Sequence, residues 1–193
     1  GRVVVIEERP EGKTPAADQE LAVEWGRRLS EAESNSDLVI LKTSGWTGAS
    51  DQSWHRFCLR QADRVISMIE DGSFISNTDS RSFHGSDVVF IGKTFSRETI
   101  EFWRDLLLPR ACHRIRDGNH FDSDVERLGR RVTGRSVGLV LSGGAARGMA
   151  HIGVIEVLTK AGIVIDRVGG SSMGALIAAM FAVGRSTDEM MKL

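Results

Sequence analysis

The chain has 193 residues, of which 41% are hydrophobic and 26% charged, as is typical of a globular protein that can bury a core. Its 25 Lys and Arg residues nearly balance its 26 Asp and Glu residues, and neither half has the strong basic excess of a nucleic-acid-binding protein. Cys58 and Cys112 fit neither a disulfide framework nor a metal-site spacing, so we expect free thiols and no metal or other cofactor. The longest apolar stretch, residues 174–183, is too short to cross a bilayer, and we expect a cytoplasmic or peripheral membrane location.

The first two-thirds of the chain alternate between short apolar runs, typical of buried strands, and amphipathic segments, typical of helices. The runs that predict strands are residues 3–6, 38–41, 65–69 and 88–91. Helices are expected after the N-cap residues Thr14 (with Pro15 as the first helical residue), Ser50 or Asp51, and Ser96. Residues 71–87 are rich in Ser, Gly and Asn and are expected to form a long loop.

Ser123 and Glu126 have the spacing of a capping box and predict the start of another helix. Short helices between apolar strands favour an α/β fold with mainly parallel sheets. We therefore expect residues 1–134 to form a Rossmann-like α/β region. This region has no glycine fingerprint and no obvious catalytic cluster, so a regulatory or simply packing role is expected for it.

A second unit is expected over residues 135–193, and it contains two glycine-rich turns. The predicted order is a strand at 137–141, a turn at 142–148, a helix at 149–161 ended by Gly162, a strand at 163–168, a second turn and a helix at 173–183. In such a βαβα unit both turns follow the carboxyl ends of parallel strands. That edge of a parallel sheet is where ligands bind.

The second turn, Gly170-Ser171-Ser172-Met173-Gly174, has the form G-x-S-x-G between a predicted strand and a predicted helix. This context favours a nucleophile elbow, in which Ser172 would stand on a sharp turn with its hydroxyl clear of the backbone. Gly170 and Gly174 would then be required because strand and helix approach closely there. The alternative is an ordinary glycine-rich connection in which Ser171 or Ser172 caps the helix.

Three interpretations compete for the first turn. A dinucleotide fingerprint fits Gly143 and Gly148, but Ala145 takes its middle glycine position and the next strand ends without a carboxylate. A phosphate-binding P-loop would end in Gly-Lys-Ser/Thr, whereas this turn ends in Arg147, Gly148 and Met149. The third interpretation is an oxyanion hole, in which the small residues let backbone N–H groups face a reacting carbonyl.

The segments 140–148, 150–154 and 168–175 together resemble the start of a patatin-like phospholipase domain, in the branch of neuropathy-target-esterase-like proteins. The resemblance is weaker in residues 54–63 and 121–133. It implies a serine esterase that acts on carboxylic ester bonds, with Ser172 as the nucleophile. It also assigns the oxyanion turn to Gly143, Gly144, Ala145, Arg147 and Gly148.

Ala145 stands where the family has a third glycine, a change that keeps the backbone N–H. Arg147 could orient the turn or attract a lipid phosphate, but a solvated or ion-paired side chain is the favoured interpretation. The resemblance further implies a phospholipid or lysophospholipid substrate and action at a membrane surface. It also implies cyclic-nucleotide-binding domains upstream in the parent chain.

The family uses a Ser-Asp dyad whose aspartate is followed by glycine far downstream of the serine. After Ser172 the only acids are Asp188 and Glu189, which lie in a predicted helix start and are not followed by glycine. No histidine follows Ser172, and His151 is more simply a packed helix residue than a catalytic group. We therefore expect the catalytic aspartate to lie beyond a truncated fragment that is inactive alone. The alternative function is a nucleotide-binding or regulatory α/β module without hydrolase activity.

Overall fold

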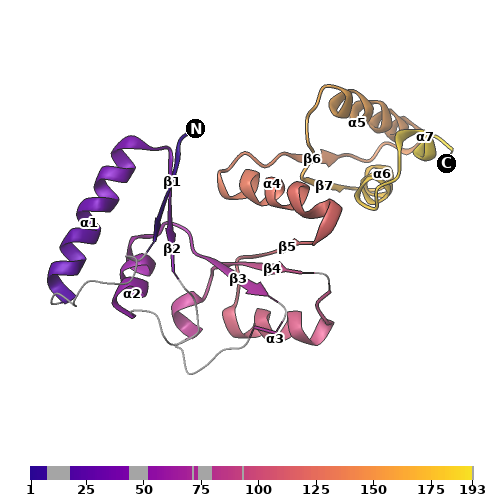
Figure 1. The fold of residues 1–193 in the computed structure, drawn as a ribbon. Helices are drawn as coiled ribbons and strands as arrows, with labels where there is room; N and C mark the ends of the chain where they lie inside the picture. The colour runs from indigo at the N-terminus through magenta and orange to yellow at the C-terminus, as the bar shows by residue number, and fades with distance from the viewer. Residues whose placement is uncertain (8–17, 44–51, 71, 74–79, 93, 193) are drawn as a thin grey trace. The chain divides into compact units, whose positions relative to one another are not determined.

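The computed structural model describes residues 1–7, 18–43, 52–70, 72–73, 80–92 and 94–192 (Figure 1). They form two compact units, Gly1–Asp117 and Gly118–Leu193. Each unit is an α/β arrangement in which every paired strand is parallel to its neighbour, which confirms the predicted fold class. By compactness, residues 118–134 group with the second unit. The domain assignment of 1–134 and 135–193 stays a prediction, because compactness alone does not define a domain boundary.

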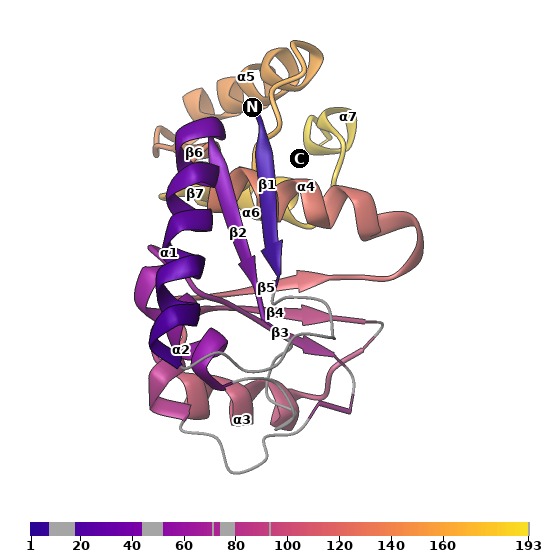
Figure 2. The same cartoon turned by 60° about the vertical axis from the view of Figure 1, so that its left-hand side comes forward.

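The first unit contains two parallel sheets (Figures 1 and 2). Strands β1 (Val3–Glu7) and β2 (Leu38–Lys42) pair with each other, and helix α1 (Asp18–Asn35) connects them. The other sheet has the order β3 (Ile66–Glu70), β4 (Asp87–Ile91) and β5 (Ala111–Ile115). Its flanking elements are α2 (Gln52–Gln61), the 3₁₀ turn η1 (Ser80–Phe83) and α3 (Arg97–Leu107).

Aromatic side chains build the core beside β1 and β2. Trp25 of α1 meets Trp54 of α2 edge-on, with ring centroids 5.2 Å apart, and Phe57 stacks on Trp54 at 5.6 Å. All three side chains are buried, together with Ile6 of β1 and Leu29 of α1. These large rings exclude water from the sheet face, which is the main source of stability in this part of the unit.

Most of the strands and helices predicted in the first unit are confirmed. Ser96 caps α3 by accepting a hydrogen bond from the Thr99 N–H at 3.1 Å, and the helix ends at Leu107. The predicted caps at Thr14, Ser50 and Asp51 lie outside the described residues. The expected long loop at 71–87 is interrupted by η1, which buries Phe83, and it ends where β4 begins at Asp87. Strand β5 was not predicted.

The second unit contains a two-stranded parallel sheet made of β6 (Gly138–Leu141) and β7 (Arg167–Gly170), with Leu141 opposite Gly170. Its buried core includes Leu141, Ile152, Ile155, Ile177 and Met190. Its elements are the 3₁₀ turn η2 (Gly118–His120), α4 (Phe121–Val132), β6 (Gly138–Leu141), the 3₁₀ turn η3 (Ala145–Met149), α5 (Ala150–Lys160), β7 (Arg167–Gly170), α6 (Met173–Ala182) and α7 (Thr187–Met190).

Two predicted boundaries in this unit are wrong. Helix α4 begins at Phe121, and Ser123 lies within its first turn, where its hydroxyl donates to the His120 carbonyl at 2.9 Å instead of forming a capping box. Strand β7 begins at Arg167 and not at residue 163, because β6 itself begins only at Gly138, which pairs with Arg167.

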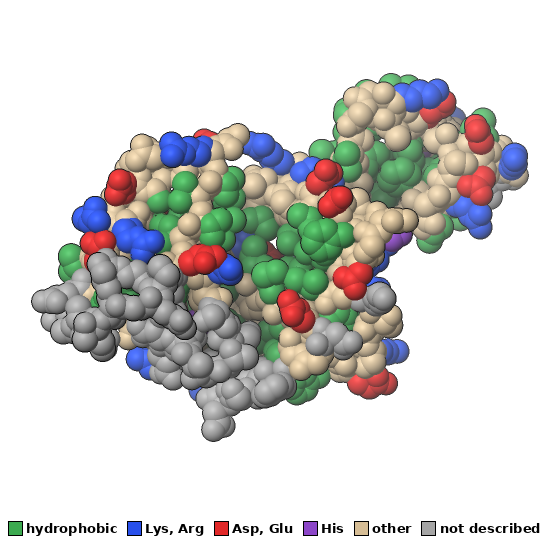
Figure 3. Space-filling view, viewed as in Figure 1, with side chains coloured by type: hydrophobic (Ala, Val, Ile, Leu, Met, Phe, Trp, Pro, Cys, Tyr) green, Lys and Arg blue, Asp and Glu red, His purple; other side chains and the backbone are tan. Residues whose placement is uncertain are grey.

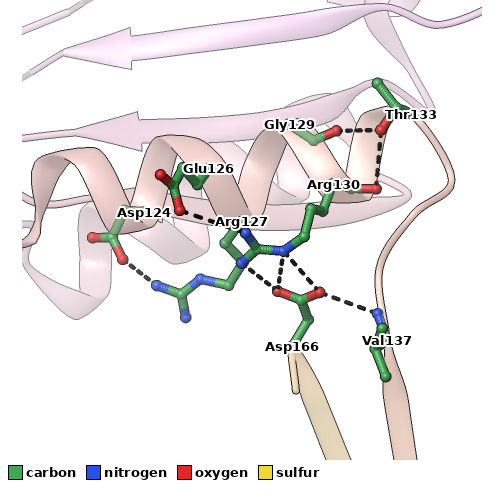
Figure 4. A network of polar contacts seen from close by, with 8 residues as sticks. All are labelled: Asp124, Glu126, Arg127, Gly129, Arg130, Thr133, Val137 and Asp166. Atoms are coloured by element: carbon green, nitrogen blue, oxygen red, sulfur yellow. Dashed lines mark hydrogen bonds and ion pairs between the residues drawn. The ribbon is translucent and has the colours of Figure 1, made fainter. Parts of the chain in front are cut away.

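A charged pair ties α4 to the start of the sheet (Figure 4). Arg130 donates to the Asp166 carboxylate from Nε at 3.0 Å and from Nη2 at 2.8 Å. The same carboxylate accepts a hydrogen bond from the Val137 N–H at 3.1 Å, just before β6. One side chain therefore joins the helix to the segments that enter both strands.

Among the described residues, no helix combines the length and the apolar character that crossing a membrane would require. Hydrophobic side chains nevertheless reach the surface of both units between charged groups, as the face in Figure 3 shows. In the second unit Val140, Val157 and Val183 are 83%, 66% and 76% exposed.

Candidate active site

The two glycine-rich turns meet at the carboxyl ends of β6 and β7. Because these strands are parallel neighbours, the segments that follow Leu141 and Gly170 leave the sheet side by side. The Ser171 N–H donates to the Leu141 carbonyl at 3.0 Å, and the Gly143 N–H donates to Ser171 Oγ at 3.1 Å. The structure therefore brings together the two turns that the sequence predicted to share a site.

Close backbone packing explains the two outer glycines of the second turn. A Cβ on Gly170 would lie 2.5 Å from the carbonyl carbon of Gly174. A Cβ on Gly174 would lie 2.3 Å from the Leu141 carbonyl oxygen and 2.5 Å from the Ser142 oxygen. Side chains cannot approach backbone atoms this closely, so only glycine fits at either position.

Ser172 has a backbone conformation that is rare for any residue except glycine. Its φ is 50° and its ψ is −125°, outside the regions that are comfortable for an L-amino acid. It is the N-cap residue of α6, yet its side chain makes no capping hydrogen bond, and the residue is exposed. Such strain, about 1–3 kcal/mol, collects at functional positions. The interpretation of Ser172 as a helix-capping side chain does not match this geometry.

The first turn lies against Ser172. A Cβ on Gly143 would lie 3.2 Å from the Ser172 Cβ, so the turns are in van der Waals contact. Within the described part of the chain, neither the Gly144 N–H nor the Ala145 N–H has a hydrogen-bond partner. These two amides are therefore available to an incoming oxygen atom. Ala145 has a φ of 48°, in the left-handed region that favours glycine.

The last two residues of the predicted oxyanion turn have different surroundings. Gly148 is buried, and a Cβ there would lie 2.5 Å from Cγ and 2.8 Å from Cβ of Met173, the first residue of α6. It therefore lets η3 pack against α6. Arg147 is exposed; its backbone N–H donates to the Gly144 carbonyl at 3.0 Å, which closes the turn.

His151 has a contact that the sequence did not reveal. Its Nε2 lies 2.9 Å from the Ser142 carbonyl oxygen, one helical turn after the glycine-rich segment. Since a carbonyl can only accept, Nε2 carries the hydrogen. The only sequence signal was the position of a polar ring shortly after the turn.

The acids downstream of Ser172, Asp188 and Glu189, lie in the first turn of α7. Glu189 forms a capping box with Ser186 at the start of α7, as predicted, and also pairs with Arg185. In the chain as far as the structure describes it, no Asp or Glu side chain is hydrogen-bonded to Ser172, and no group of three or more His, Cys, Asp or Glu residues could hold a metal ion. Among the described residues, the two turns therefore bring together a strained serine and two amides without hydrogen-bond partners, and no carboxylate is bonded to that serine.

Known proteins are similar in sequence to the segment that carries both turns. The family model of the patatin-like phospholipase matches residues 139–193, which begin in β6 and include both turns. Residues 139–193 belong to the patatin-like phospholipase family. The resemblance expected from the sequence is thereby confirmed.

Relatives extend the similarity upstream of the patatin-like segment. An uncharacterized NTE family protein of Mycobacterium tuberculosis is 37% identical over 192 residues, which cover 98% of this chain and 31% of that protein. An NTE family protein of Mycobacterium bovis gives the same values. The lysophospholipase nte1 of Aspergillus fumigatus is 56% identical over 62 residues, 32% of this chain and 4% of that protein.

The chain therefore spans less than a third of the length of the mycobacterial relatives. No solved structure matches it. These relatives are NTE family proteins and a lysophospholipase nte1, which confirms the resemblance to the NTE-like branch that the sequence motifs predicted.

Proposed function

We propose that the patatin-like segment supplies the nucleophile and the oxyanion donors of a serine lipid hydrolase. The observation that carries this proposal is the strained backbone of Ser172, at φ 50° and ψ −125°, beside the first turn. Within the described residues, the Gly144 and Ala145 N–H groups of that turn have no hydrogen-bond partner. A serine is held in such a conformation where its hydroxyl must stand clear of the backbone. The N-terminus of the ten-residue helix α6 adds a positive potential at the same point.

In the proposed reaction, Ser172 Oγ attacks the carbonyl carbon of an acyl ester while its proton passes to a general base. The negative charge that develops on the carbonyl oxygen is stabilised by the N–H groups of Gly144 and Ala145. Each such donor contributes about 3–4 kcal/mol to the transition state. Collapse of this intermediate breaks the ester C–O bond, and the base returns the proton to the departing alcohol. Water then releases the acyl group from Ser172 by the same route.

The proposed base is an aspartate that follows residue 193 in the full-length protein. Asp188 and Glu189 are the only acids after Ser172, and both belong to the first turn of α7. Relatives about three times as long as this chain have room for the remaining part of such a domain. A Ser-Asp dyad completed in this way would make the 193-residue chain inactive by itself.

We further propose a phospholipid or lysophospholipid as the substrate, because the Aspergillus relative is named a lysophospholipase. The acyl ester of such a lipid offers the carbonyl that the two amides can hold. A lipid substrate also implies that the full-length protein works at a membrane surface. Upstream cyclic-nucleotide-binding domains remain an expectation from the resemblance alone.

The test is hydrolysis of lysophosphatidylcholine by the purified full-length protein. Ser172→Ala should lower kcat by at least about a thousandfold, because a serine hydrolase without its nucleophile retains only the residual effect of binding and the oxyanion hole. Ser34→Ala is the matched control, since Ser34 is an exposed serine of α1 whose hydroxyl donates to the Ser30 carbonyl of the same helix. Hydrolysis that persists in Ser172→Ala would overturn the proposal.

A further inference from the structure

Two side chains from different elements hold a single peptide group in the first turn. The peptide between Ser142 and Gly143 presents its carbonyl to His151 Nε2 at 2.9 Å. Its N–H points to Ser171 Oγ at 3.1 Å. His151 belongs to α5, whereas Ser171 lies between β7 and α6. Both polar groups of this peptide are therefore fixed by side chains that come from different elements.

This peptide needs such support because two glycines stand at its C-terminal side. Gly143 and Gly144 have no side chains to restrict their backbone, so the peptide before them can rotate at little steric cost. A rotation of this peptide would turn the adjacent Gly144 N–H, one of the two proposed oxyanion donors. An oxyanion donor is effective only when it already points at the reacting oxygen, so the orientation of this peptide sets the quality of the hole.

Neither side chain is placed to react. His151 Nε2 carries a hydrogen that is already donated to a carbonyl, so this nitrogen cannot accept the proton of Ser172. The imidazolium and the neutral ring with hydrogen on Nε2 both donate this bond. Ser171 Oγ accepts from the Gly143 amide, and its backbone N–H continues the sheet by donating to Leu141.

We propose that His151 and Ser171 are positioning residues, which lock the Ser142–Gly143 peptide and thereby orient the amides of Gly144 and Ala145. This inference rests on the proposed hydrolase function. It predicts that loss of either hydrogen bond slows the chemical step and leaves substrate binding unchanged. It also predicts that the two residues act on the same peptide group and are therefore coupled.

The experiment compares variants of the full-length protein in the hydrolysis of p-nitrophenyl butyrate. His151→Phe keeps a ring without the donor, and Ser171→Ala removes the acceptor. Each should lower kcat by about 10–100-fold, with KM within about twofold of the wild type, since these changes disorient a donor without deleting it. His151→Gln and Ser171→Thr keep the donor and the acceptor and should recover kcat to within about threefold.

The double variant His151→Phe/Ser171→Ala tests the shared peptide. Once one bond is lost and the peptide has rotated, losing the second should add less than about threefold to the effect on kcat. Effects that multiply would show that the two residues act independently, and this would overturn the inference. So would a full kcat in both single variants, or a failure of both Gln and Thr to restore it. If His151→Phe does not fold, the comparison of kcat between Ser171→Ala and Ser171→Thr still tests the inference.

Failure of the proposed function has a different signature. In that case the wild-type protein has no esterase activity that depends on Ser172, and a fluorophosphonate probe does not modify Ser172. If only the positioning inference fails, Ser172 is modified and the wild type is active, but the variants at residues 151 and 171 turn over like the wild type.

Discussion

Gly174 lies so close to Leu141 that a Cβ on the glycine would stand 2.3 Å from the Leu141 carbonyl oxygen. This relationship joins the first turn of α6 to the end of β6. Because the neighbouring atom belongs to the backbone, no side-chain rotation can relieve the clash. The exit of the polypeptide from β7 into α6 is therefore compatible only with glycine at this point.

Gly174→Ala should destabilise the second unit by about 3 kcal/mol, the upper end of the cost of overpacking, because strand or helix must move. The measurement is the free energy of unfolding by denaturant titration. Gly153→Ala is the matched control, since Gly153 lies within α5 and a Cβ there meets no atom within 4 Å. This control should be neutral or stabilising by up to about 1 kcal/mol. Equal stabilities of the two variants would contradict the close approach.

The strain at Ser172 can be measured without a substrate. Ser172→Gly should make the protein about 1 kcal/mol more stable than Ser172→Ala, because glycine adopts a φ of 50° without steric cost. The neighbouring Ser171 is the control, because its φ is not positive. Glycine at this position only increases the entropy of the unfolded chain, so the stability difference between the Gly and Ala variants should have the opposite sign. Ser171→Gly should be less stable than Ser171→Ala. The same order at both positions would argue against a strained elbow.

The pair formed by Arg130 and Asp166 predicts a response to acid. The hydrogen bonds from Arg130, with those from the Val137 N–H and the Ser136 side chain, hold the pKa of Asp166 below its ordinary value of 3.8. A folded-state pKa lower than the unfolded one gives stability that is fully present above about pH 4 and is lost as the pH falls through the folded-state value. The wild type should therefore lose more stability below pH 4 than Asp166→Asn. Parallel unfolding curves between pH 4 and pH 2 would contradict this.

Arg130→Met tests the same pair at neutral pH. Asp166 is only 3% exposed, so removal of its partner leaves a buried carboxylate with fewer donors. The expected loss is about 2–3 kcal/mol of unfolding free energy. Arg97→Met is the matched control, because the pair of Arg97 and Glu101 on α3 is exposed and should contribute less than about 0.5 kcal/mol. If Arg130→Met lost as little unfolding free energy as Arg97→Met, the pair of Arg130 and Asp166 would not stabilise the second unit, and the prediction would be contradicted.

Most features that depend on neighbouring residues were predictable from the sequence, with the capping box predicted at Ser123 as an exception. The cap at Ser96, the capping box of Ser186 and Glu189, and the helix end at Gly162 are each specified within a few residues and are confirmed. The strand, turn and helix around Ser172 were equally local, because the glycine spacing and the flanking apolar runs lie in one short segment.

Features that depend on distant residues were not predictable. Strand β5 reads Ala-Cys-His-Arg-Ile, without an apolar run, and becomes a strand only through its pairing with β4. The start of β7 was predicted too early because the strand begins only where β6 begins, at the pair of Gly138 and Arg167, which lie 29 residues apart in the sequence. The contact of His151 with the Ser142 carbonyl requires the folded turn, which residue types alone do not show.

The central claim is that Ser172 is the nucleophile, and reaction of the full-length protein with a fluorophosphonate probe tests it most directly. Peptide mass spectrometry can distinguish the two adjacent serines by fragmentation. We predict covalent modification at Ser172, none at Ser171, and complete loss of labelling in Ser172→Ala. An unlabelled protein, or a label on Ser171, would contradict the account.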